Sequence, residues 1–303
     1  MNISRTEIMR SRYSSVVILM LIMGLCGMCN KKELNNIFYV QNTLDGFDNA
    51  PMTHGGKAKL LKKIGYDGLE GSGYKDFYEL RNALKNEDLA MPVNYVALNF
   101  EAERNPEDSS VREIKEMIRS SDKSSVIYFH LHSNTYKNDK SAGDKVVTEI
   151  LRELSDFAHQ YGVKLCVYPH ISFYCETVAH GVKLAGMVDR KNYGASMNLC
   201  HLLKVEGTEE IDAKIKEYVP YLFAVNICGA DSGDTKNLGW DRLIQPLGKG
   251  SFDTYHFIKS LRDNGYTGPI GLQCYNLKGD AFETLTSSMD TWKEYIERYK
   301  KGQ

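Results

Sequence analysis

Short β-rich runs alternate with longer amphipathic runs along most of this chain. The amphipathic runs place apolar residues three or four positions apart, as on one face of a helix, most clearly over 144–161. The predicted strands are 38–40, 66–70, 93–100, 126–132, 163–168, 193–199, 221–227 and 270–274. The predicted helices are 58–64, 74–84, 111–118, 144–161, 176–188, 209–219, 252–261 and 281–299.

Regular alternation of strands and helices predicts parallel β/α units. Eight such units in a chain of 303 residues fit a closed barrel, so we predict an α/β fold, a single-domain (β/α)₈ TIM barrel over residues 30–303. An open, doubly wound sheet is the alternative. That fold holds dinucleotides at a Gly-x-Gly-x-x-Gly turn, and no such turn follows the first strand, so no nucleotide cofactor is expected.

Residues 1–29 have the pattern of a secretory signal. Three arginines precede an apolar run at 16–27, which is too short to span a bilayer. Cys26 lies at the end of this run and Cys29 just after it, where a bacterial lipoprotein signal has its lipid-modified cysteine. We therefore expect an exported protein, located in the periplasm or attached to a membrane as a lipoprotein. An uncleaved membrane anchor is the alternative.

The charge balance bears on the class of partner. The formal net charge is −1 and no basic stripe is present, which argues against nucleic acid because phosphate binding needs a positive field. The cysteines beyond the signal are odd in number, and their spacing is not that of a disulfide framework. Nothing in the sequence indicates an oligomeric state.

Polar side chains gather at the carboxyl ends of the predicted strands, where barrels of this kind build their active sites. The set is Glu70, His130, His132, Tyr168, His170, Asn198, His201, Asn226, Gln273 and Tyr275. One histidine at a strand end is as often a hydrogen-bonded core residue as a functional one. The convergence of four of the eight histidines predicts a polar site at the barrel mouth.

A long segment between the seventh strand and its helix, 228–250, is the second candidate feature. Loops of this length in a compact domain are usually functional or disordered. Trp240, Arg242 and Lys249 are placed to cover and hold a polar ligand. The alternative is a structural loop that packs on the barrel rim.

At these residues the sequence resembles the xylose isomerase-like barrels, the sugar phosphate isomerase/epimerase superfamily that includes the family 2 apurinic endonucleases. The resemblance covers 36–300 and is most specific over 244–275. Members commonly have a Gly-x-Gly-x-(Ile/Phe)-Asp loop there, followed by a final strand that ends in a metal-binding Glu. The resemblance implies a sugar or keto-sugar as the small-molecule partner.

The sequence departs from this family where its epimerases bind one divalent metal. They use Glu, Asp, His and Glu at the ends of strands five to eight, and the matching residues here are Tyr168, Asn198, Asn226 and Gln273. These neutral side chains do not balance the charge of a dication, and the pair of carboxylates that would shuttle a proton is lost too. His201 still matches the family histidine three residues after the second ligand.

The metal content is therefore left open at this point. A divalent metal relocated to the histidines and Glu70 is one alternative, and a metal-free site is the other. Removal of a proton next to a carbonyl needs a base that titrates near neutral pH and a group that stabilises an enolate. We expect the catalytic residues to be His170, His201, His132, Glu70 and Tyr168. The expected substrate-binding residues are Asn198, Asn226, Gln273, Tyr275, Trp240 and Lys249.

Two functions remain open on the sequence. The first is an exported carbohydrate enzyme that works by enolisation, either an isomerase or epimerase, or a lyase or hydratase on a 3-keto sugar. The second is a non-catalytic sugar-binding barrel that has lost the family's metal site. A role in DNA repair is excluded by the missing metal ligands and by the expected export.

Overall fold

All pairings between strands are parallel in the computed structural model, which describes residues 33–101 and 109–303. The strands follow one another around the sheet in the order β2-β1-β9-β8-β7-β6-β5-β4-β3. They are β1 (Phe38–Val40), β2 (Gly68–Leu69), β3 (Gly71–Ser72), β4 (Val93–Asn99), β5 (Val126–His132), β6 (Lys164–Val167), β7 (Tyr193–Asn198), β8 (Leu222–Ile227) and β9 (Ile270–Leu272).

The two end strands of this order are halves of one extended segment interrupted at Glu70. β2 pairs with β1 and β3 pairs with β4, so this segment closes the sheet into a barrel of eight staves. Glycine is required on both sides of Glu70. A Cβ on Gly68 would lie 2.1 Å from the Ala90 carbonyl oxygen, and one on Gly71 would lie 2.1 Å from Asn94 Oδ1. The strand predicted to end at Glu70 therefore continues through Ser72.

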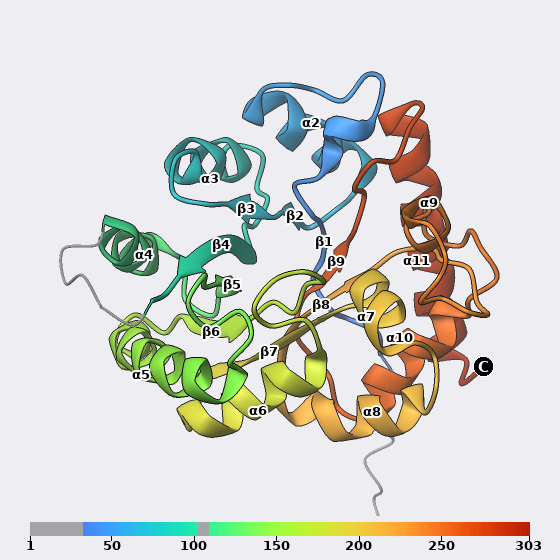
Figure 1. Cartoon of the computed structure of the whole chain (residues 1–303). Helices are drawn as coiled ribbons and strands as arrows, with labels where there is room; N and C mark the ends of the chain where they lie inside the picture. The colour runs from blue at the N-terminus through green and yellow to red at the C-terminus, as the bar shows by residue number, and fades with distance from the viewer. Residues whose placement is uncertain (1–32, 102–108) are drawn as a thin grey trace, which may run out of the picture.

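Helices surround the barrel, one after each stave (Figure 1). They are α2 (His54–Ile64), α3 (Phe77–Lys85), α4 (Ser109–Ser120), α5 (Lys140–His159), α6 (Val178–Val188), α8 (Ile211–Tyr218), α10 (Thr254–Asp263) and α11 (Ala281–Lys300). Several begin at a Thr or Asp whose side chain accepts a hydrogen bond from a backbone N–H of the first turn, for example Thr177 before α6 and Asp280 before α11. The predicted (β/α)₈ TIM barrel is confirmed.

Short helical segments were not expected from the pattern. α7 (Leu199–Glu206) starts directly after β7, because Asn198 Oδ1 accepts the backbone N–H of Cys200 and caps it. His201 therefore lies in the first turn of a helix and not on a strand end. α9 (Trp240–Leu243) lies in the segment expected to be a loop, and the 3₁₀ turns η1 (Leu44–Gly46) and η2 (Val219–Tyr221) complete the set.

Aromatic side chains fill the inside of the barrel. Tyr39 and Tyr128 are fully buried there and pack with Tyr168. Gly271 makes room for this layer, because a Cβ at that position would lie 2.6 Å from Tyr39 Cζ. The larger apolar core lies between strands and helices, where Phe38 stacks on Trp292 with ring centroids 4.2 Å apart.

The predicted signal at 1–29 lies outside the described residues. Within 33–101 and 109–303, no helix is both long and apolar enough to cross a membrane. The cysteines of this part of the chain are buried and unbridged.

Candidate active site

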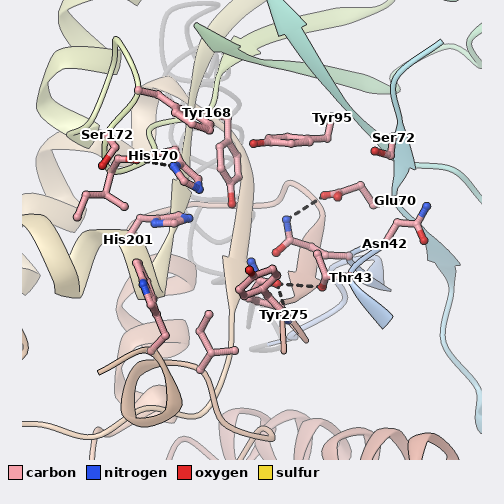
Figure 2. A pocket seen from close by; sticks show the side chains of 16 residues that line it. Asn42, Thr43, Glu70, Ser72, Tyr95, Tyr168, His170, Ser172, His201 and Tyr275 are labelled. Carbon is pink, nitrogen blue, oxygen red and sulfur yellow. Dashed lines mark hydrogen bonds between the residues drawn. The ribbon is translucent and has the colours of Figure 1, made fainter. Parts of the chain in front are cut away.

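A cavity of about 470 Å³ lies at the carboxyl ends of the strands. Its lining residues come mainly from the segments that follow β1, β2, β6, β7 and β9, together with the long β8–α10 segment (Figure 2). They are Gln41, Asn42, Thr43, Glu70, Ser72, Tyr95, Tyr168, His170, Ile171, Ser172, Phe173, His201, Trp240, Ile244, Gln273 and Tyr275. This volume lies within the usual range of small-molecule sites.

Glu70 is the carboxylate in the cavity wall. Its Oε2 accepts a hydrogen bond from Gln41 Nε2 at 2.9 Å and another from the Tyr128 hydroxyl. Burial raises the pKa of Glu70 to about 8, although the hydrogen bonds from Gln41 and the Asn42 backbone act in the opposite direction. Most of the Glu70 population is therefore protonated at neutral pH and has a proton to donate.

His170 and His201 lie on the opposite side of the cavity from Glu70 (Figure 2). The Nδ1 of His170 lies 2.6 Å from the Ile171 carbonyl oxygen, so Nδ1 carries the proton and Nε2 keeps its lone pair. The ring stacks on Phe173 with centroids 4.0 Å apart. Burial lowers the pKa of His170, so its imidazole is neutral near pH 7.

His201 contacts both His170 and the long β8–α10 segment. Its ring centroid is 4.0 Å from that of His170 and 5.4 Å from that of Trp240. Burial and the neighbouring His170 lower the pKa of His201 to about 3. With so low a pKa, His201 is a poor proton acceptor near neutral pH, and it packs against His170 as an uncharged neighbour.

His130 and His132 do not line the cavity. They lie on β5, with His130 Nδ1 2.6 Å from His132 Nε2, and His130 stacks on Tyr95 at 4.1 Å between centroids. Burial lowers the pKa of both imidazoles. Phe173 packs against both rings and itself lines the cavity. His132, expected nearest the mouth, is not among the described lining residues, and its catalytic role stays a prediction.

Asp231 organises the long segment after β8. Its carboxylate accepts hydrogen bonds from Arg242 Nε, from Gln245 Nε2 at 3.1 Å and from the Ser251 backbone N–H at 3.1 Å. This anchor places Trp240 against the cavity. Arg242 is engaged with Asp231. Lys249 is exposed and outside the cavity lining, so the structure does not place it as a ligand-binding residue.

The residues at the family's metal positions are engaged with protein donors. Asn198 Nδ2 donates to the Tyr168 hydroxyl, while Asn198 Oδ1 accepts from the Cys200 backbone. Asn226 is fully buried below the cavity, where its Oδ1 accepts from the Tyr39 hydroxyl at 2.9 Å. Asn226 therefore supports the barrel interior and is not placed to touch a ligand, contrary to expectation.

Gln273 is held at the cavity wall by its carbonyl oxygen. Its Oε1 accepts from the Thr43 hydroxyl and from the Tyr275 backbone N–H, each at 2.9 Å. The amide nitrogen of Gln273 has no hydrogen bond of its own among the described contacts, so it can donate to a ligand. Tyr275, two residues after Gln273 in the sequence, is 59% exposed at the cavity rim.

These contacts do not suit a divalent metal at the family's position. The oxygens of Asn198, Asn226 and Gln273, which a cation would need, already accept protein hydrogen bonds. Among residues 33–101 and 109–303, no three His, Cys, Asp or Glu side chains are grouped to hold a metal ion. The donor set that remains consists of imidazoles, amides, phenols and one carboxyl group.

The sequence pattern missed part of the wall. Gln41, Asn42 and Thr43 directly follow β1, and the rule used for the other strands would have found them there. Tyr95 lies in the middle of β4, and Phe173 lies beyond a strand end. The strand-end rule reaches neither position: Tyr95 faces the barrel interior from β4, where it packs against Tyr128 and Tyr168, and the β6–α6 connection brings Phe173 to the cavity.

The fold and the site define a parallel barrel with a polar cavity at the carboxyl ends of its strands. The chain belongs to the xylose isomerase-like TIM barrel family, whose sequence model matches residues 58–301. No curated protein sequence matches the chain significantly.

Solved structures with the same fold share little sequence with this chain. The IOLI protein, solved with a zinc atom, gives a TM-score of 0.68 at 18% identity, over 86% of this chain and 98% of that one. The 3-keto-D-glucoside 4-epimerase YcjR from E. coli gives 0.66 at 16%, over 86% and 99%. The probable 3-DHS dehydratase AsbF from Bacillus anthracis gives 0.67 at 14%, over 84% and 98%. At these identities the likeness establishes the fold alone.

Proposed function

We propose that this protein is an enzyme that removes a proton from the carbon next to a sugar carbonyl, with His170 as the base and Glu70 as the acid. The observation that carries the proposal is the placement of a neutral imidazole and a protonated carboxyl group on opposite sides of one cavity (Figure 2). Acid and base with separated roles are the arrangement that proton-transfer catalysis requires.

The base is His170 because its hydrogen bonding fixes one tautomer. Nδ1–H donates to the Ile171 carbonyl oxygen, which leaves the lone pair of Nε2 free to accept a proton. We assign the stabilisation of the enolate to Tyr168. Burial raises its pKa well above the ordinary value, so the phenol stays protonated, and its oxygen already accepts from Asn198 Nδ2. The phenol proton is therefore available to an enolate oxygen.

The proton and electron balance is as follows. His170 Nε2 takes the proton from the carbon beside the carbonyl, and the C–H electron pair forms the C=C bond of an enolate. In an elimination, the carbonyl re-forms, the bond to a leaving oxygen on the next carbon breaks, and Glu70 gives that oxygen its proton. In an epimerisation, Glu70 returns a proton to the same carbon from the opposite face. Proton exchange with solvent restores both residues.

The activities named for two structural neighbours support this chemistry. One is described as a 3-keto-D-glucoside 4-epimerase and the other as a probable 3-DHS dehydratase. The first points to a keto-sugar and the second to an elimination. We propose a keto-sugar as the substrate, turned over by isomerisation or epimerisation, or by a lyase or hydratase reaction on a 3-keto sugar.

Export is part of the proposal. The basic and apolar pattern of residues 1–29 supports a location in the periplasm, or on a membrane as a lipoprotein attached through Cys26 or Cys29. The cysteines of the barrel are buried and unbridged, so this location does not rest on disulfides.

A sugar-binding barrel without catalysis is the second candidate. It is favoured by the hydrogen bonds that occupy Asn198, Asn226 and Gln273, which hold the former metal positions in a fixed, uncharged arrangement.

Hydrogen–deuterium exchange at the carbon beside the ketone separates the two candidates. 3-Keto-glucosides and their epimers are incubated with the protein in D₂O and followed by NMR, with and without added divalent metal. We expect exchange that is unaffected by a chelator and lost in His170→Gln. His159→Gln, on the exposed face of α5, is the matched control and keeps full exchange. Absence of exchange under every condition, or exchange that survives His170→Gln, contradicts the catalytic proposal.

A further inference from the structure

The walls of the cavity differ in chemical character. Asn42 and Thr43 lie on the side of Glu70 in Figure 2, Gln41 donates to Glu70, and Gln273 accepts from Thr43. Aromatic side chains line the cavity as well, including Tyr95, Tyr168, Phe173, Trp240 and Tyr275. Aromatic faces pack on the apolar faces of a ring, while amides and hydroxyls bind groups at its edge. A sugar ring has both features.

The described residues that line this cavity supply no cation of their own. Among its described lining residues there is neither lysine nor arginine. Lys57 donates to Asn42 Oδ1 at 3.0 Å and pairs with Asp45 at 3.6 Å. Arg242 is bound to Asp231. The imidazoles that line the wall are neutral because burial lowers their pKa values.

A charged sugar therefore finds no counter-ion in the described wall. A phosphate or carboxylate placed there loses its hydration without gaining the paired hydrogen bonds that arginine supplies. It also raises the cost of ionising Glu70, which must give up its proton in the proposed reaction.

The rim adds a second feature. Tyr275 lines the cavity, yet 59% of the residue remains exposed to solvent. Trp240 is half-buried beside His201 and also borders the cavity. Exposed aromatic side chains at a cavity edge are typical of a binding surface. They extend the aromatic wall outward, beyond the polar groups that surround Glu70.

We infer that the cavity selects an uncharged glycoside over a sugar phosphate or a sugar acid, with the sugar ring beside Glu70 and His170 and the second group of the glycoside against Trp240 and Tyr275. This inference rests on the proposed function for the identity of the site and goes beyond it in naming the substrate class.

The chain contains its own reporter for this inference. Of its two tryptophans, Trp240 lines the cavity and Trp292 is buried against Phe38. In the Trp292→Phe variant, the remaining tryptophan fluorescence reports on the cavity alone. Calorimetry on the unmutated protein gives the same binding constants independently, so a variant that folds poorly does not stop the test.

The probes fall into an uncharged and a charged group of sugars. Methyl glucosides, galactosides, mannosides and xylosides and the disaccharides cellobiose and lactose are compared with glucose 6-phosphate, galactose 6-phosphate and glucuronate. We expect saturable binding of at least one neutral glycoside, and binding at least tenfold weaker for its charged counterpart. Equal or tighter binding of a charged sugar overturns the inference, and so does a lack of binding across all neutral probes.

Variants at the rim test where the second group lies. Tyr275→Ala is expected to weaken disaccharide binding about two- to tenfold, the range expected for the loss of one aromatic contact, and to leave methyl glycosides nearly unchanged. Tyr221→Ala, at a tyrosine that is 40% exposed and does not line the cavity, is the control. Equal loss for both ligand classes contradicts the rim assignment.

The result is separable from that of the proposed function. Selective binding of neutral glycosides without deuterium exchange in any keto-sugar leaves this inference standing and removes catalysis. Exchange in keto-sugar phosphates, combined with their tighter binding, leaves catalysis standing and removes this inference.

Discussion

The imidazole rings of His170 and His201 lie with centroids 4.0 Å apart at an interplanar angle of 49°, although the two residues come from successive strand–helix connections. Both are neutral near pH 7, because burial lowers the pKa of each and the neighbouring His170 adds to the lowering at His201. A neutral His170 keeps its Nε2 available as a proton acceptor near pH 7.

The dependence of turnover on pH follows from these two groups and Glu70. Activity rises with pH as His170 loses its proton, at a pH below the ordinary histidine pKa of 6.5. It falls again as Glu70 loses its proton near pH 8. We expect a bell-shaped profile of kcat/KM with an alkaline limb near pH 8. Glu70→Gln should lower kcat by about 10²–10⁴-fold and remove the alkaline limb. An unchanged limb in that variant contradicts the role of Glu70.

Glu70 also makes stability depend on pH. Burial raises its pKa from 4.5 to about 8, so between these values the folded protein keeps a proton that the unfolded chain has lost. The free energy of unfolding, measured relative to Glu70→Gln, is therefore highest below pH 4.5. It falls as the pH rises from 4.5 through 8. At about 1.4 kcal/mol per pKa unit, the variant should be more stable by roughly 3–5 kcal/mol above pH 8.

Urea unfolding at pH 5 and pH 8.5 measures this difference. Glu79→Gln, on the exposed face of α3, is the control and should show no such pH dependence. If Glu70→Gln gains no stability between the two pH values, Glu70 is ionised in the folded protein at neutral pH.

Asp231 should control ligand affinity without contacting the ligand. Asp231→Ala removes the acceptor shared by Arg242, Gln245 and Ser251, and so frees the segment that carries Trp240. We expect KM or Kd to rise several-fold with kcat little changed, because His170 and Glu70 lie on other segments. Asp212→Ala breaks an exposed ion pair with His256 and serves as the control. A loss of kcat with constant KM argues against this positioning role.

Asp144 ties the outer helices to the connection that carries His170. Its carboxylate, only 1% exposed, accepts from the Tyr174 hydroxyl and His180 Nε2 at 2.8 Å each and pairs with Lys183. Asp144→Asn should lower the free energy of unfolding by about 1–3 kcal/mol, and should also lower kcat by loosening the connection.

A control substitution for Asp144→Asn lies on the same helix, α5. Asp156→Asn, whose partner Arg190 is exposed, should change stability and kcat little. Hydrogen exchange of residues 170–177 should speed up in Asp144→Asn alone. Equal effects of the two substitutions contradict a specific role for Asp144.

Local rules carried the prediction of the fold and part of the site. Alternating strands and helices led to the barrel, and the strand-end rule led to Glu70, Tyr168, His170 and Gln273, all in the cavity wall. The same rule applied to β1 would have added Gln41. It failed for Asn226, which ends its strand as expected but turns its amide to Tyr39 in the barrel interior.

The remaining misses share one physical cause. Lys249 and Trp240 lie in one segment, yet only Trp240 meets the cavity, because Asp231 folds that segment back on the barrel. His132 packs against Phe173, a residue from the next connection along the chain, and only Phe173 lines the cavity. Contacts of this kind join residues far apart in sequence, so the local hydrophobic pattern does not predict them.

By itself, the sequence determined the eightfold β/α repeat, the edge of the barrel that carries the site, and the uncharged side chains of Tyr168, Asn198, Asn226 and Gln273 near the strand ends, since these follow from local periodicity and residue type. Only the tertiary structure decided which tautomer of His170 is held and that the carboxyl group opposite keeps its proton. Both depend on burial and on hydrogen-bond partners, which exist only once the barrel has closed.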